Sequence, residues 1–476
     1  MSTLPSLSLK HLVELLNAAG CAARLEGADT QVSGMTVDSR EAAPGCLFVC
    51  KGVSFKPAFL ASAIEAGAAA YLCDETLAHA VAQAGSTAPR IVASDVRRAM
   101  AIVAAKAYGR PDERLNIIGI TGTKGKSTTA YMLRSIFAAA NIETSILGSI
   151  ETDDGFEHYK SHNTTPEAPE LWRHLHNTEE AGRDIMVMEV SSHGLKYDRV
   201  LGLHLSTACF LNIGRDHISP IEHPTFEDYF ESKLRIFDQA KTAVVNLGTE
   251  EVDRVLEAAS TAERLVTVGV EHPEASLWAS DVRMVGFSIE FNLHGLCADE
   301  SEMGEKVLLG IAGDFNVENA LVAIAAAREI GIGIEAIKKG LSKLRVPGRM
   351  EVVESKDGRV ICVVDYAHNQ LSFRSLFSSV KRAFPASPVI ALFGAAGGKA
   401  QERREQLPRE AAPYSDLMIF ANEDPAREDP MKVCRELAEH VPDDTPNKII
   451  LDREAAVHAA FKAAREEYVN PDAPTI

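Results

Sequence analysis

Residues 116–128 read NIIGITGTKGKST, and this stretch decides the fold around which the rest of the chain is arranged. A short apolar run leads into Gly122 and Gly125, which are followed directly by Lys126 and Ser127. This order is typical of a buried strand, a glycine turn and the first turn of a helix. Such a turn directs backbone N–H groups and a helix dipole at a phosphate. The stretch therefore predicts a phosphate-binding loop, and ATP is its expected ligand.

The match to the strict P-loop pattern is incomplete, because that pattern has glycine where this chain has Ile120. The groups that perform the chemistry are nevertheless present. Lys126 can reach the β- and γ-phosphates, and the Ser127 hydroxyl can bind Mg²⁺. A glycine-rich turn that only opens a helix is the alternative interpretation. The expected nucleotide contacts are Gly122, Thr123, Lys124, Gly125, Lys126, Ser127 and Thr128.

Downstream of this loop, apolar strands alternate with helical stretches. The runs 184–190, 208–213 and 243–246 are short and apolar, and helix-like sequence lies among them. This alternation predicts a parallel α/β sheet. Between about 264 and 312 the apolar residues alternate with polar ones, as in 284–291, which predicts a small antiparallel patch.

Linker-like stretches divide the chain into three expected domains, 1–110, 111–343 and 344–476. The last of these contains βα units and is expected to be Rossmann-like, with predicted strands at 360–364, 389–393, 417–420 and 448–451. No GxGxxG motif follows its first strand, so a bound dinucleotide is not expected. The chain stops at Ile476, where another strand is expected to begin, and this predicts a truncated C-terminal domain.

The composition is that of a soluble globular protein, and its charge excludes two classes of partner. The 476 residues carry a formal net charge of −18, which disfavours non-specific binding to nucleic acid or to anionic membranes. The eight cysteines are scattered without a CxxC pair, which favours reduced, buried thiols over zinc sites or disulfides. No signal-peptide pattern is present, and no apolar run reaches about 20 residues, the length of a membrane span. We expect a cytoplasmic protein.

Further polar residues follow the predicted strands or lie in loops. The segment Asn163–Pro166 offers hydroxyls, Glu189 ends an apolar strand, and Asp216 and His217 follow the next strand. The carboxyl ends of parallel strands form the ligand edge of such a sheet, where a carboxylate near a P-loop suits Mg²⁺. Each of these groups could equally cap a helix or a turn, and Lys233 taken alone is typical of a solvated helix.

In order and spacing, these motifs resemble the Mur ligase family over nearly the whole chain. The matching segments are GTKGKST (122–128), NTTP (163–166), EVSSHGL (189–195), NIGRDH (212–217), YFESK (229–233), GDFNVENA (313–320), VPGRME (346–351) and DYAHN (365–369). Near the N-terminus, DSR (38–40), Pro44-Gly45 and LFV (47–49) resemble the branch that adds the third residue of the peptidoglycan stem peptide.

The resemblance implies an amide-forming ligase with a UDP-binding N-terminal domain, a central ATPase and a Rossmann-like C-terminal domain. In such enzymes a carboxylate of UDP-N-acetylmuramoyl-L-Ala-D-Glu takes the γ-phosphoryl group of ATP, and an incoming amine then displaces phosphate. Mg²⁺ and Lys126 would offset the repulsion between the carboxylate and the triphosphate. ATP ligands on two domains imply closure on binding.

Positions that match the family's motifs carry its expected roles. The expected catalytic and metal centre is Lys126, Ser127, Glu189, His217 and Lys233, of which Lys233 matches a lysine that is carbamylated in these ligases. Contacts to the UDP-linked substrate are expected at Ser39, Asn163, Thr164, Thr165, Ser191, Tyr197 and Arg199. Further contacts to ATP are expected at Asn319, Arg349, Asp365 and His368.

The loop 423–426 corresponds to the segment that selects the incoming amino acid in this branch. Members that take meso-diaminopimelate read Asp-Asn-Pro-Arg there, whereas this chain reads Glu423, Asp424, Pro425 and Ala426. Ala426 cannot pair with a distal carboxylate, and the two acidic side chains suit an ε-ammonium, so L-lysine is the expected substrate. The expected partner of the amino acid's α-carboxylate is Arg403 or Arg404.

Several alternatives stay open from the sequence. Arg427 lies one residue from the selective position and could bind diaminopimelate, and ornithine is shorter than lysine by one methylene. The acidic loop could also be an exposed turn in which Asp429 caps a helix that starts with Pro430. More distant alternatives are a sister ligase that adds D-Ala-D-Ala, a folylpolyglutamate synthetase, and an inactive nucleotide-binding interaction protein. We expect a monomer that binds ATP, Mg²⁺, the UDP-muramoyl dipeptide and a free amino acid.

Overall fold

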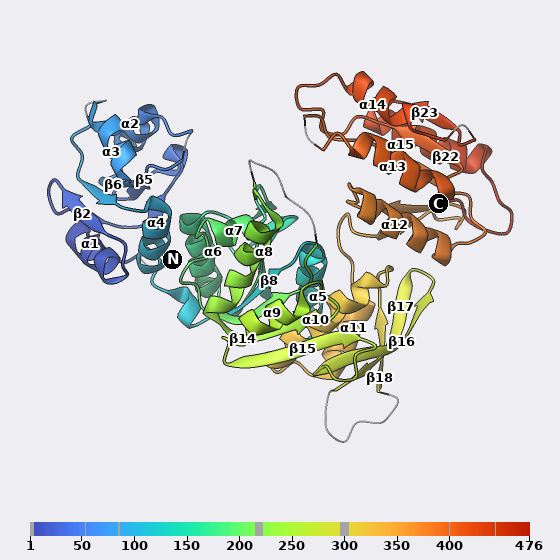
Figure 1. Cartoon of the computed structure of the whole chain (residues 1–476), viewed down its shortest axis with the longest axis horizontal. Coiled ribbons are helices and arrows are strands. Elements are labelled where there is room, and N and C mark those ends of the chain that lie inside the picture. The colour runs from blue at the N-terminus through green and yellow to red at the C-terminus, as the bar shows by residue number, and fades with distance from the viewer. Residues whose placement is uncertain are drawn as a thin grey trace. The chain divides into compact units, whose positions relative to one another are not determined.

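The computed structural model describes residues 4–52, 54–83, 86–214, 222–295, 304–398, 400–442 and 444–476 (Figure 1). The chain divides into two compact units. Unit 1 comprises Met1–Ala279, His294–Glu300 and Glu318–Gly340, and unit 2 comprises Ser280–Leu293, Ser301–Val317 and Leu341–Ile476. Both units combine helices with β-sheets, which confirms the predicted α/β class.

The first part of unit 1 is a five-stranded sheet in the order β2-β7-β6-β5-β4. Its elements are β2 (Ala23–Glu26), β4 (Met35–Thr36), β5 (Leu47–Val49), β6 (Ala70–Cys73) and β7 (Arg90–Ala93), with α1 (Leu9–Ala18), α2 (Pro57–Glu65), α3 (Glu75–Gln83) and α4 (Val96–Ala107). β4 to β7 pair in parallel, and β2 lies antiparallel to β7. β5 and β6 are buried along their whole length, as expected for apolar central strands. β1 (Leu7–Ser8) and β3 (Gln31–Val32) form a separate pair.

The strand predicted from the opening motif, β8 (Asn116–Thr121), lies inside the large sheet of unit 1, which has the order β11-β10-β9-β12-β8-β13-β14-β15. The other strands are β9 (Thr144–Leu147), β10 (Glu151–Asp153), β11 (His158–Lys160), β12 (Ile185–Glu189), β13 (Leu205–Phe210), β14 (Ala240–Asn246) and β15 (Arg264–Val270). β9, β12, β8, β13, β14 and β15 pair in parallel, which confirms the predicted sheet. The strand ends differ from the predicted ones by up to three residues.

Helices lie between most of these parallel strands, and two more follow after residue 314. They are α5 (Lys126–Ala139), α6 (Ala168–Glu180), α7 (Ser192–Lys196), α8 (Phe226–Leu234), α9 (Val252–Ala259), α10 (Phe315–Glu329) and α11 (Ile334–Ser342). Two of them start at hydroxyl caps. The Ser191 side chain accepts a hydrogen bond from the Gly194 N–H at α7, and the Thr225 side chain accepts one from the Asp228 N–H at α8. These caps fix the first turns of two helices that carry site residues.

The predicted antiparallel patch is only partly confirmed. β16 (Leu277–Val285) begins in parallel beside β15, whereas β17 (Ser288–His294) pairs antiparallel with β18 (Glu305–Leu309). The run 284–291, predicted as one alternating strand, crosses the turn between β16 and β17. Gly286 has a φ of 62°, a left-handed conformation that favours glycine, and this conformation interrupts the strand.

Unit 2 contains a parallel sheet in the order β21-β22-β23 and an antiparallel pair, β19 and β20. Its elements from residue 351 onward are β19 (Glu351–Glu354), β20 (Ile361–Val364), β21 (Ile390–Phe393), β22 (Leu417–Phe420), β23 (Asn447–Ile449), α12 (Gln370–Ala383), α13 (Arg403–Ala411), α14 (Pro430–Glu439) and α15 (Arg453–Glu466). The strands predicted near 389, 417 and 448 are confirmed. The strand predicted at 360–364 pairs with β19 rather than joining the three-stranded sheet.

The last two residues of the chain connect these two sheets of unit 2. Thr475 forms a parallel bridge with Val360, and its carbonyl accepts a hydrogen bond from the Ile361 N–H at 2.9 Å. The Ile390 N–H donates to the Ile476 carbonyl at 2.8 Å. Thr475 is only 1% exposed. The chain therefore ends in extended backbone that lies beside β20 on one side and β21 on the other.

Two broader expectations concern cysteines and membranes. Seven cysteines belong to the described part of the chain, and all seven are free thiols, six of them buried. This agrees with the expectation of reduced thiols, whereas Cys297 lies outside the described residues. Among the residues that the structure describes, no helix combines the length and the apolar character needed to cross a membrane.

Candidate functional site

The loop after β8 has the conformation that its glycines predict. Gly122 has a φ of 152° and Gly125 a φ of 89°, and Gly125 directly precedes α5. A Cβ atom on Gly122 would lie 2.9 Å from the Leu211 Cβ, and one on Gly125 would overlap the Asn319 side chain. Both positions therefore need glycine, because backbone conformation and space exclude a larger residue.

Lys126, the first residue of α5, folds back over this loop. Its Nζ donates hydrogen bonds to the Gly122 carbonyl at 2.7 Å and to the Thr123 carbonyl at 3.3 Å. Ser127 and Thr128 follow in the first turn and are buried. An ammonium group held over a loop at a helix N-terminus provides positive charge where a phosphate would bind.

Asn212, which the sequence analysis did not single out, closes the loop from the end of β13. Its Oδ1 accepts the Lys124 N–H at 2.9 Å, and its Nδ2 donates to the Lys124 carbonyl at 3.2 Å. The Thr123 N–H donates to the Asn212 carbonyl at 3.0 Å. The signal was present in the sequence, because Asn212 opens the NIGRDH segment. Asp216 and His217, from the same segment, lie outside the described residues.

Glu189 ends β12 with its carboxylate buried, at 2% exposure. Its Oε1 accepts the Ser149 N–H at 2.8 Å, and its Oε2 accepts the Ser149 hydroxyl at 3.2 Å. Gly148 leaves room for this carboxylate, since a Cβ atom there would overlap Oε1. The Ser149 hydroxyl also lies 2.8 Å from the Thr164 hydroxyl, which connects Glu189 to the predicted substrate loop. Ser149 carried no recognisable sequence signal.

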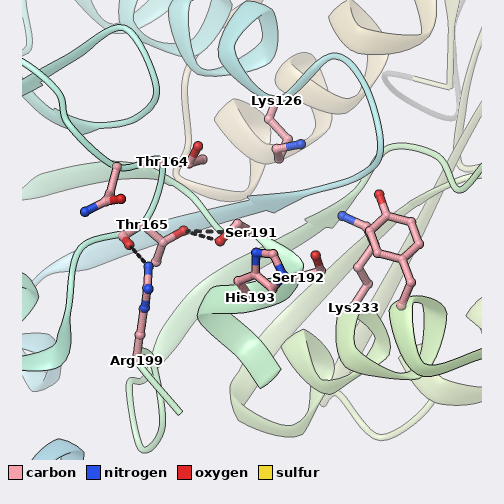
Figure 2. A pocket seen from close by; sticks show the side chains of 10 residues that line it. Lys126, Thr164, Thr165, Ser191, Ser192, His193, Arg199 and Lys233 are labelled. Atoms are coloured by element: carbon pink, nitrogen blue, oxygen red, sulfur yellow. Dashed lines mark hydrogen bonds between the residues drawn. The ribbon is translucent and has the colours of Figure 1, made fainter. Parts of the chain in front are cut away.

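A cavity of about 220 Å³ brings together residues from both predicted halves of the site (Figure 2). Its lining residues come from the start of α5, the 163–165 loop, the segment 191–199 around α7, and α8. They are Lys126, Asn163, Thr164, Thr165, Ser191, Ser192, His193, Arg199, Tyr229 and Lys233. The predicted phosphate-binding lysine therefore lines one cavity with five of the predicted substrate contacts, whereas Ser39 and Tyr197 are not among the described lining residues.

Thr165 holds one wall of this cavity together. Its hydroxyl donates to the Glu189 carbonyl at 3.0 Å and accepts the Ser191 N–H at 2.9 Å. The Arg199 guanidinium donates to the Thr165 carbonyl at 2.8 Å (Figure 2). A Cβ on Gly194 would lie 2.9 Å from the Thr165 Cγ2. Thr165 thus joins the 163–165 loop to the end of β12 and the start of α7.

Lys233, on α8, is a buried lysine rather than a solvated one. It is 1% exposed, and its Nζ donates to the Gly122 carbonyl at 2.9 Å and lies 4.8 Å from the centre of the Tyr229 ring. Lys126 donates to the same carbonyl. Two lysine side chains therefore converge on one backbone oxygen of the phosphate loop.

Residues of the N-terminal part reach the Arg199 side of this site. Glu167 forms ion pairs with Arg199 at 3.0 Å and with Lys51 at 3.2 Å. The Arg97 guanidinium lies 4.5 Å from the centre of the Tyr197 ring. Burial lowers the pKa of Lys51, and Glu167 opposes this shift. Sequence motifs did not identify these three partners, since each is an ordinary charged residue. Ser39 lies elsewhere in this part, in the short 3₁₀ turn Ser39–Glu41.

A buried ion pair supports the hairpin that precedes the 163–165 loop. His174 Nδ1 lies 2.6 Å from Asp154 Oδ2, and both side chains are buried. Asn177 donates to the same oxygen at 2.8 Å, and Tyr159 OH lies 3.1 Å from His174 Nε2. Burial raises the pKa of Asp154, but hydrogen bonds from His174, backbone N–H groups and Asn177 lower it to about 2. Burial lowers the pKa of His174, yet hydrogen bonds to Asp154 and Glu170 raise it overall.

Replacing His174 with leucine is expected to destabilise the protein by about 3–5 kcal/mol, because Asp154 stays buried without its charged partner. The raised pKa of His174 means that its contribution is complete below pH about 6.5 and declines as pH rises through its folded-state pKa. Urea denaturation at several pH values measures both effects. His158→Leu, an exposed histidine on β11, is the control and should cost below about 1 kcal/mol. Equal losses for the two variants would contradict the argument.

In unit 2, the three residues expected to contact ATP gather around Tyr366. The Arg349 guanidinium lies 4.5 Å from the centre of the Tyr366 ring, and His368 Nδ1 lies 2.8 Å from the Tyr366 carbonyl. Asp365 accepts the N–H groups of Met350 and Ala367, each at 2.7 Å. Burial raises the pKa of Asp365, and these backbone hydrogen bonds oppose the shift.

The two arginines expected near the amino acid's α-carboxylate differ in their surroundings. Arg404 is 4% exposed, and its guanidinium donates to Glu428 at 2.8 Å and to Glu436. The Arg404 hydrogen bond, with one from the Gly398 N–H, lowers the pKa of Glu428 to about 2. Arg404 therefore holds the acidic loop in place. Arg403 is only half-buried and stays the better placed of the two for a ligand.

The acidic loop packs on a glycine-rich segment of unit 2. The Gly397 N–H donates to the Asp424 carbonyl at 2.8 Å, and a Cβ on Gly397 would overlap the Pro425 carbonyl. Glu423, Asp424 and Ala426 are exposed. The helix start predicted after this loop is confirmed, because Asp429 caps α14 and Pro430 is its first residue. The capping leaves the carboxylates of 423–424 open to solvent.

Comparison with known proteins matches two family descriptions to this chain. The Mur ligase middle domain matches residues 120–327, and the domain described as "Mur ligase, glutamate ligase domain" matches residues 348–469. A relative from Enterococcus faecalis, UDP-N-acetylmuramoyl-L-alanyl-D-glutamate–L-lysine ligase, is 35% identical over 90% of this chain and 84% of its own length. UDP-N-acetylmuramyl-tripeptide synthetase from Bifidobacterium longum is 35% identical over 93% of this chain and 86% of its own.

Solved structures show the same fold. A UDP-N-acetylmuramoyl-L-alanyl-D-glutamate–2,6-diaminopimelate ligase aligns with a TM-score of 0.64 and 25% identity over 92% of this chain and 88% of its own. MurF from Acinetobacter baumannii aligns with a TM-score of 0.67 and 20% identity over 98% of this chain and 94% of its own. At that identity, the second likeness concerns the fold alone.

Proposed function

Because the chain belongs to the Mur ligase family, we propose that it is an ATP-dependent ligase that joins an amino acid to UDP-N-acetylmuramoyl-L-alanyl-D-glutamate in peptidoglycan precursor synthesis. The observation that carries this proposal is the shared cavity. Lys126 and Lys233 line it beside the phosphate loop, and the 163–165 loop lines it together with Ser191 and Arg199, both of which are hydrogen-bonded to Thr165. A carboxylate held there can meet a γ-phosphate. ATP and a nucleotide-linked sugar as substrates support a cytoplasmic location, and we propose a monomer.

Two chemical steps account for the reaction. In the first, a carboxylate oxygen of the dipeptide attacks the γ-phosphorus, an acyl phosphate forms and ADP leaves. In the second, an amine attacks the acyl carbon, the bond from that carbon to the phosphate oxygen breaks, and inorganic phosphate leaves with the electron pair. Both reactants of the first step are anions, so a cation must lie between them. Lys126 supplies that charge from the loop, where its Nζ is already held by two carbonyls.

The donors at the end of β12 and the start of α5 fit Mg²⁺. Glu189 is a buried carboxylate held by two hydrogen bonds from Ser149, and Ser127 offers a buried hydroxyl. Hard oxygen donors of this kind are the ligands that Mg²⁺ prefers. We propose Glu189 and Ser127 as ligands, with His217 and a carbamylated Lys233 by family position. The ion would supply charge that offsets the developing negative charge on the phosphates.

The surroundings of Lys233 favour its proposed carbamylation. Lys233 and Lys126 both donate to the Gly122 carbonyl, so two ammonium groups would repel one another in a buried place. Carbamylation converts the Lys233 amine into an anion and removes this repulsion. The product would also add two oxygen donors beside the proposed metal ligands.

The remaining site residues keep their proposed roles by family position. We propose that the chain works as three domains, 1–110, 111–343 and 344–476, the last of them the domain that binds the amino acid. Substrate contacts are proposed for Ser39, Asn163, Thr164, Thr165, Ser191, Tyr197 and Arg199. Nucleotide contacts are proposed for Gly122, Thr123, Lys124, Gly125, Thr128, Asn319, Arg349, Asp365 and His368.

We propose L-lysine as the amino acid. Glu423 and Asp424 are exposed carboxylates that suit an ε-ammonium, and Ala426 has no group that could pair with a second carboxylate. The name of the Enterococcus faecalis relative states L-lysine, which supports the same choice. Ornithine and meso-diaminopimelate are the alternatives. Binding of meso-diaminopimelate would use the neighbouring Arg427 to pair with its second carboxylate.

ADP release is expected to require the UDP-linked dipeptide together with an amine, and L-lysine should be preferred over meso-diaminopimelate by about 10- to 100-fold in kcat/KM. One charge-assisted hydrogen bond, worth about 1.5–3 kcal/mol, accounts for that ratio. Steady-state rates with lysine, ornithine and meso-diaminopimelate measure it. A preference for diaminopimelate would refute the lysine assignment, and Arg427→Ala would then identify the residue responsible. ADP release that is independent of both substrates would contradict the proposed ligase reaction, and no ADP release under any of these conditions would favour an inactive nucleotide-binding protein.

A further inference from the structure

A serine, a histidine and an aspartate form a continuous hydrogen-bonded array at the proposed active site. The Ser192 Oγ lies 3.0 Å from His223 Nε2, and His223 Nδ1 lies 2.6 Å from Asp228 Oδ2. Ser192 is the first residue of α7, and Asp228 lies in the first turn of α8. The proposed chemistry described so far uses none of these three side chains.

The imidazole of His223 is fixed on every described side. It is buried, stacks on His193 at 4.8 Å between ring centres, and meets the Tyr229 ring edge-on at 5.2 Å. Lys196 also donates to Asp228 Oδ2 at 2.6 Å, which orients that carboxylate. Among the contacts given for the described residues, the charged and titratable groups beside His223 are Asp228, with Lys196 behind it, His193 and Tyr229. Such packing holds a ring in one orientation, as a proton acceptor requires.

The hydrogen-bond partners decide in which direction protons are donated along this array. An ionised carboxylate only accepts hydrogen bonds, so Asp228 holds the proton of His223 on Nδ1. The lone pair on Nε2 then accepts the Ser192 hydroxyl proton. Burial raises the pKa of Asp228, but hydrogen bonds from Lys196 and His223 lower it overall, which keeps the carboxylate ionised. The Ser192 oxygen is left with lone pairs that can accept a proton from a further group.

A ligand bound in the cavity can supply the group that gives its proton to Ser192. Ser192 lines the same cavity as Lys126 and Lys233, and its side chain lies on the side of His193 that faces Lys233 (Figure 2). The amide-forming step of the proposed reaction takes place on an acyl carbon held in this cavity. An attacking amine must lose protons to become an amide nitrogen, and no carboxylate lines the cavity among the described residues.

We propose that Ser192 is a catalytic residue that takes a proton from the attacking amine and passes its own hydroxyl proton to His223, with Asp228 as the positioning residue. This inference rests on the proposed ligase function. The amino acid's ammonium loses one proton to the Ser192 oxygen, while the Ser192 hydroxyl proton moves to His223 Nε2. The neutral nitrogen then forms a bond to the acyl carbon and gives a second proton to the departing phosphate. The bond from the acyl carbon to the phosphate oxygen breaks, and phosphate leaves with the electron pair. His223 then returns its proton to phosphate or water.

The test compares two nucleophiles on the same acyl phosphate. The amino acid is charged at neutral pH and needs a proton acceptor, whereas hydroxylamine is largely uncharged and traps an acyl phosphate as a hydroxamate without one. Ser192→Ala is expected to lower the rate with the amino acid by about 100-fold, within the usual range for general-base catalysis. The rate of hydroxamate formation from ATP and the UDP-linked dipeptide should stay within about twofold of that of the wild-type protein.

Three further variants make the result specific. Ser192→Thr keeps a hydroxyl and should retain most of the rate with the amino acid. His223→Gln, like Ser192→Ala, should lower the rate with the amino acid and leave the rate of hydroxamate formation nearly unchanged. Ser206→Ala is the control, because its hydroxyl donates only to a strand carbonyl at 2.8 Å outside the cavity. Equal loss with both nucleophiles, or no loss with either, would overturn the relay. If the wild-type protein formed neither hydroxamate nor amide, the proposed function itself would fail, and this outcome is distinct from a defect seen in the variants alone.

Discussion

Replacement of Lys126 by methionine is expected to lower kcat by about 10³-fold while the fold persists. The Lys126 ammonium is held over the phosphate loop by the Gly122 and Thr123 carbonyls, and it lines the cavity. It is therefore placed to stabilise the charge that develops on the transferred phosphoryl group. Removing one such preorganised donor costs about 10²–10³-fold in other enzymes, and a full charge belongs at the upper end of that range.

The measurement is the steady-state rate of ADP formation with saturating ATP, dipeptide and amino acid. Lys106→Met, which removes an exposed lysine from α4, is the matched control and should retain wild-type activity. Thermal unfolding of both variants shows whether the fold is kept. A Lys126→Met protein that kept more than about a tenth of the activity would exclude Lys126 from the role given to it here.

The second large effect is expected at Lys233. Lys233→Ala should lower kcat by about 10³-fold, because the anion that carbamylation would create beside the metal ligands is then missing. Short carboxylic acids such as acetate or formate should restore part of the activity, since they can fill the space with a similar anion. Lys233→Arg should be as inactive as the alanine variant, because arginine keeps the positive charge and cannot form the carbamate.

Rates measured with and without added carboxylate check this result. Lys241→Ala, at an exposed position of β14, is the control. It should keep the wild-type rate, and added carboxylate should not change that rate. If Lys233→Ala were fully active, no anion would be needed at this position. If Lys233→Arg were active, the needed group would be a cation, and the proposed carbamate would be wrong.

The strand and loop at 116–128 could be predicted because their pattern is local. Glycines with φ of 152° and 89° stand where the turn needs them, and the apolar run before them has the length of one strand. The same holds for α14, whose start at Asp429 and Pro430 depends on adjacent residues alone. Local conformational preferences decide these elements, so a single sequence is sufficient.

Pairing between distant segments could not be predicted in this way. The run 360–364 is apolar like a parallel strand, yet β20 pairs antiparallel with β19, and Thr475 from the chain's end lies on the other side. The single strand predicted at 284–291 from the alternation of apolar and polar residues was also wrong. The alternation continues across a two-residue turn that separates β16 from β17. Strand order depends on contacts that no short stretch of sequence contains.

The candidate site likewise contains residues that the sequence could predict and residues that it could not. Motif positions such as Lys126, Glu189 and Lys233 could be named from the sequence, and the structure places Lys126 and Lys233 at one cavity, with Glu189 behind its wall. Ser149, which holds Glu189 through two hydrogen bonds made across the fold, carried no sequence signal. Asn212, which holds the phosphate loop at Lys124, opens the NIGRDH segment and could have been singled out. Arg404 could be named, but its engagement with Glu428 and Glu436 follows only from its burial.

The central claim is that a carboxylate of the UDP-linked dipeptide becomes an acyl phosphate before the amide forms. The most direct measurement is an oxygen-18 transfer experiment, in which both oxygens of the reacting carboxylate are labelled and the released phosphate is examined by mass spectrometry. An acyl phosphate predicts that each phosphate released carries one labelled oxygen, because the carbon-to-oxygen bond breaks when the amine attacks. Phosphate that contains no label, released together with the amide product, would contradict the claim.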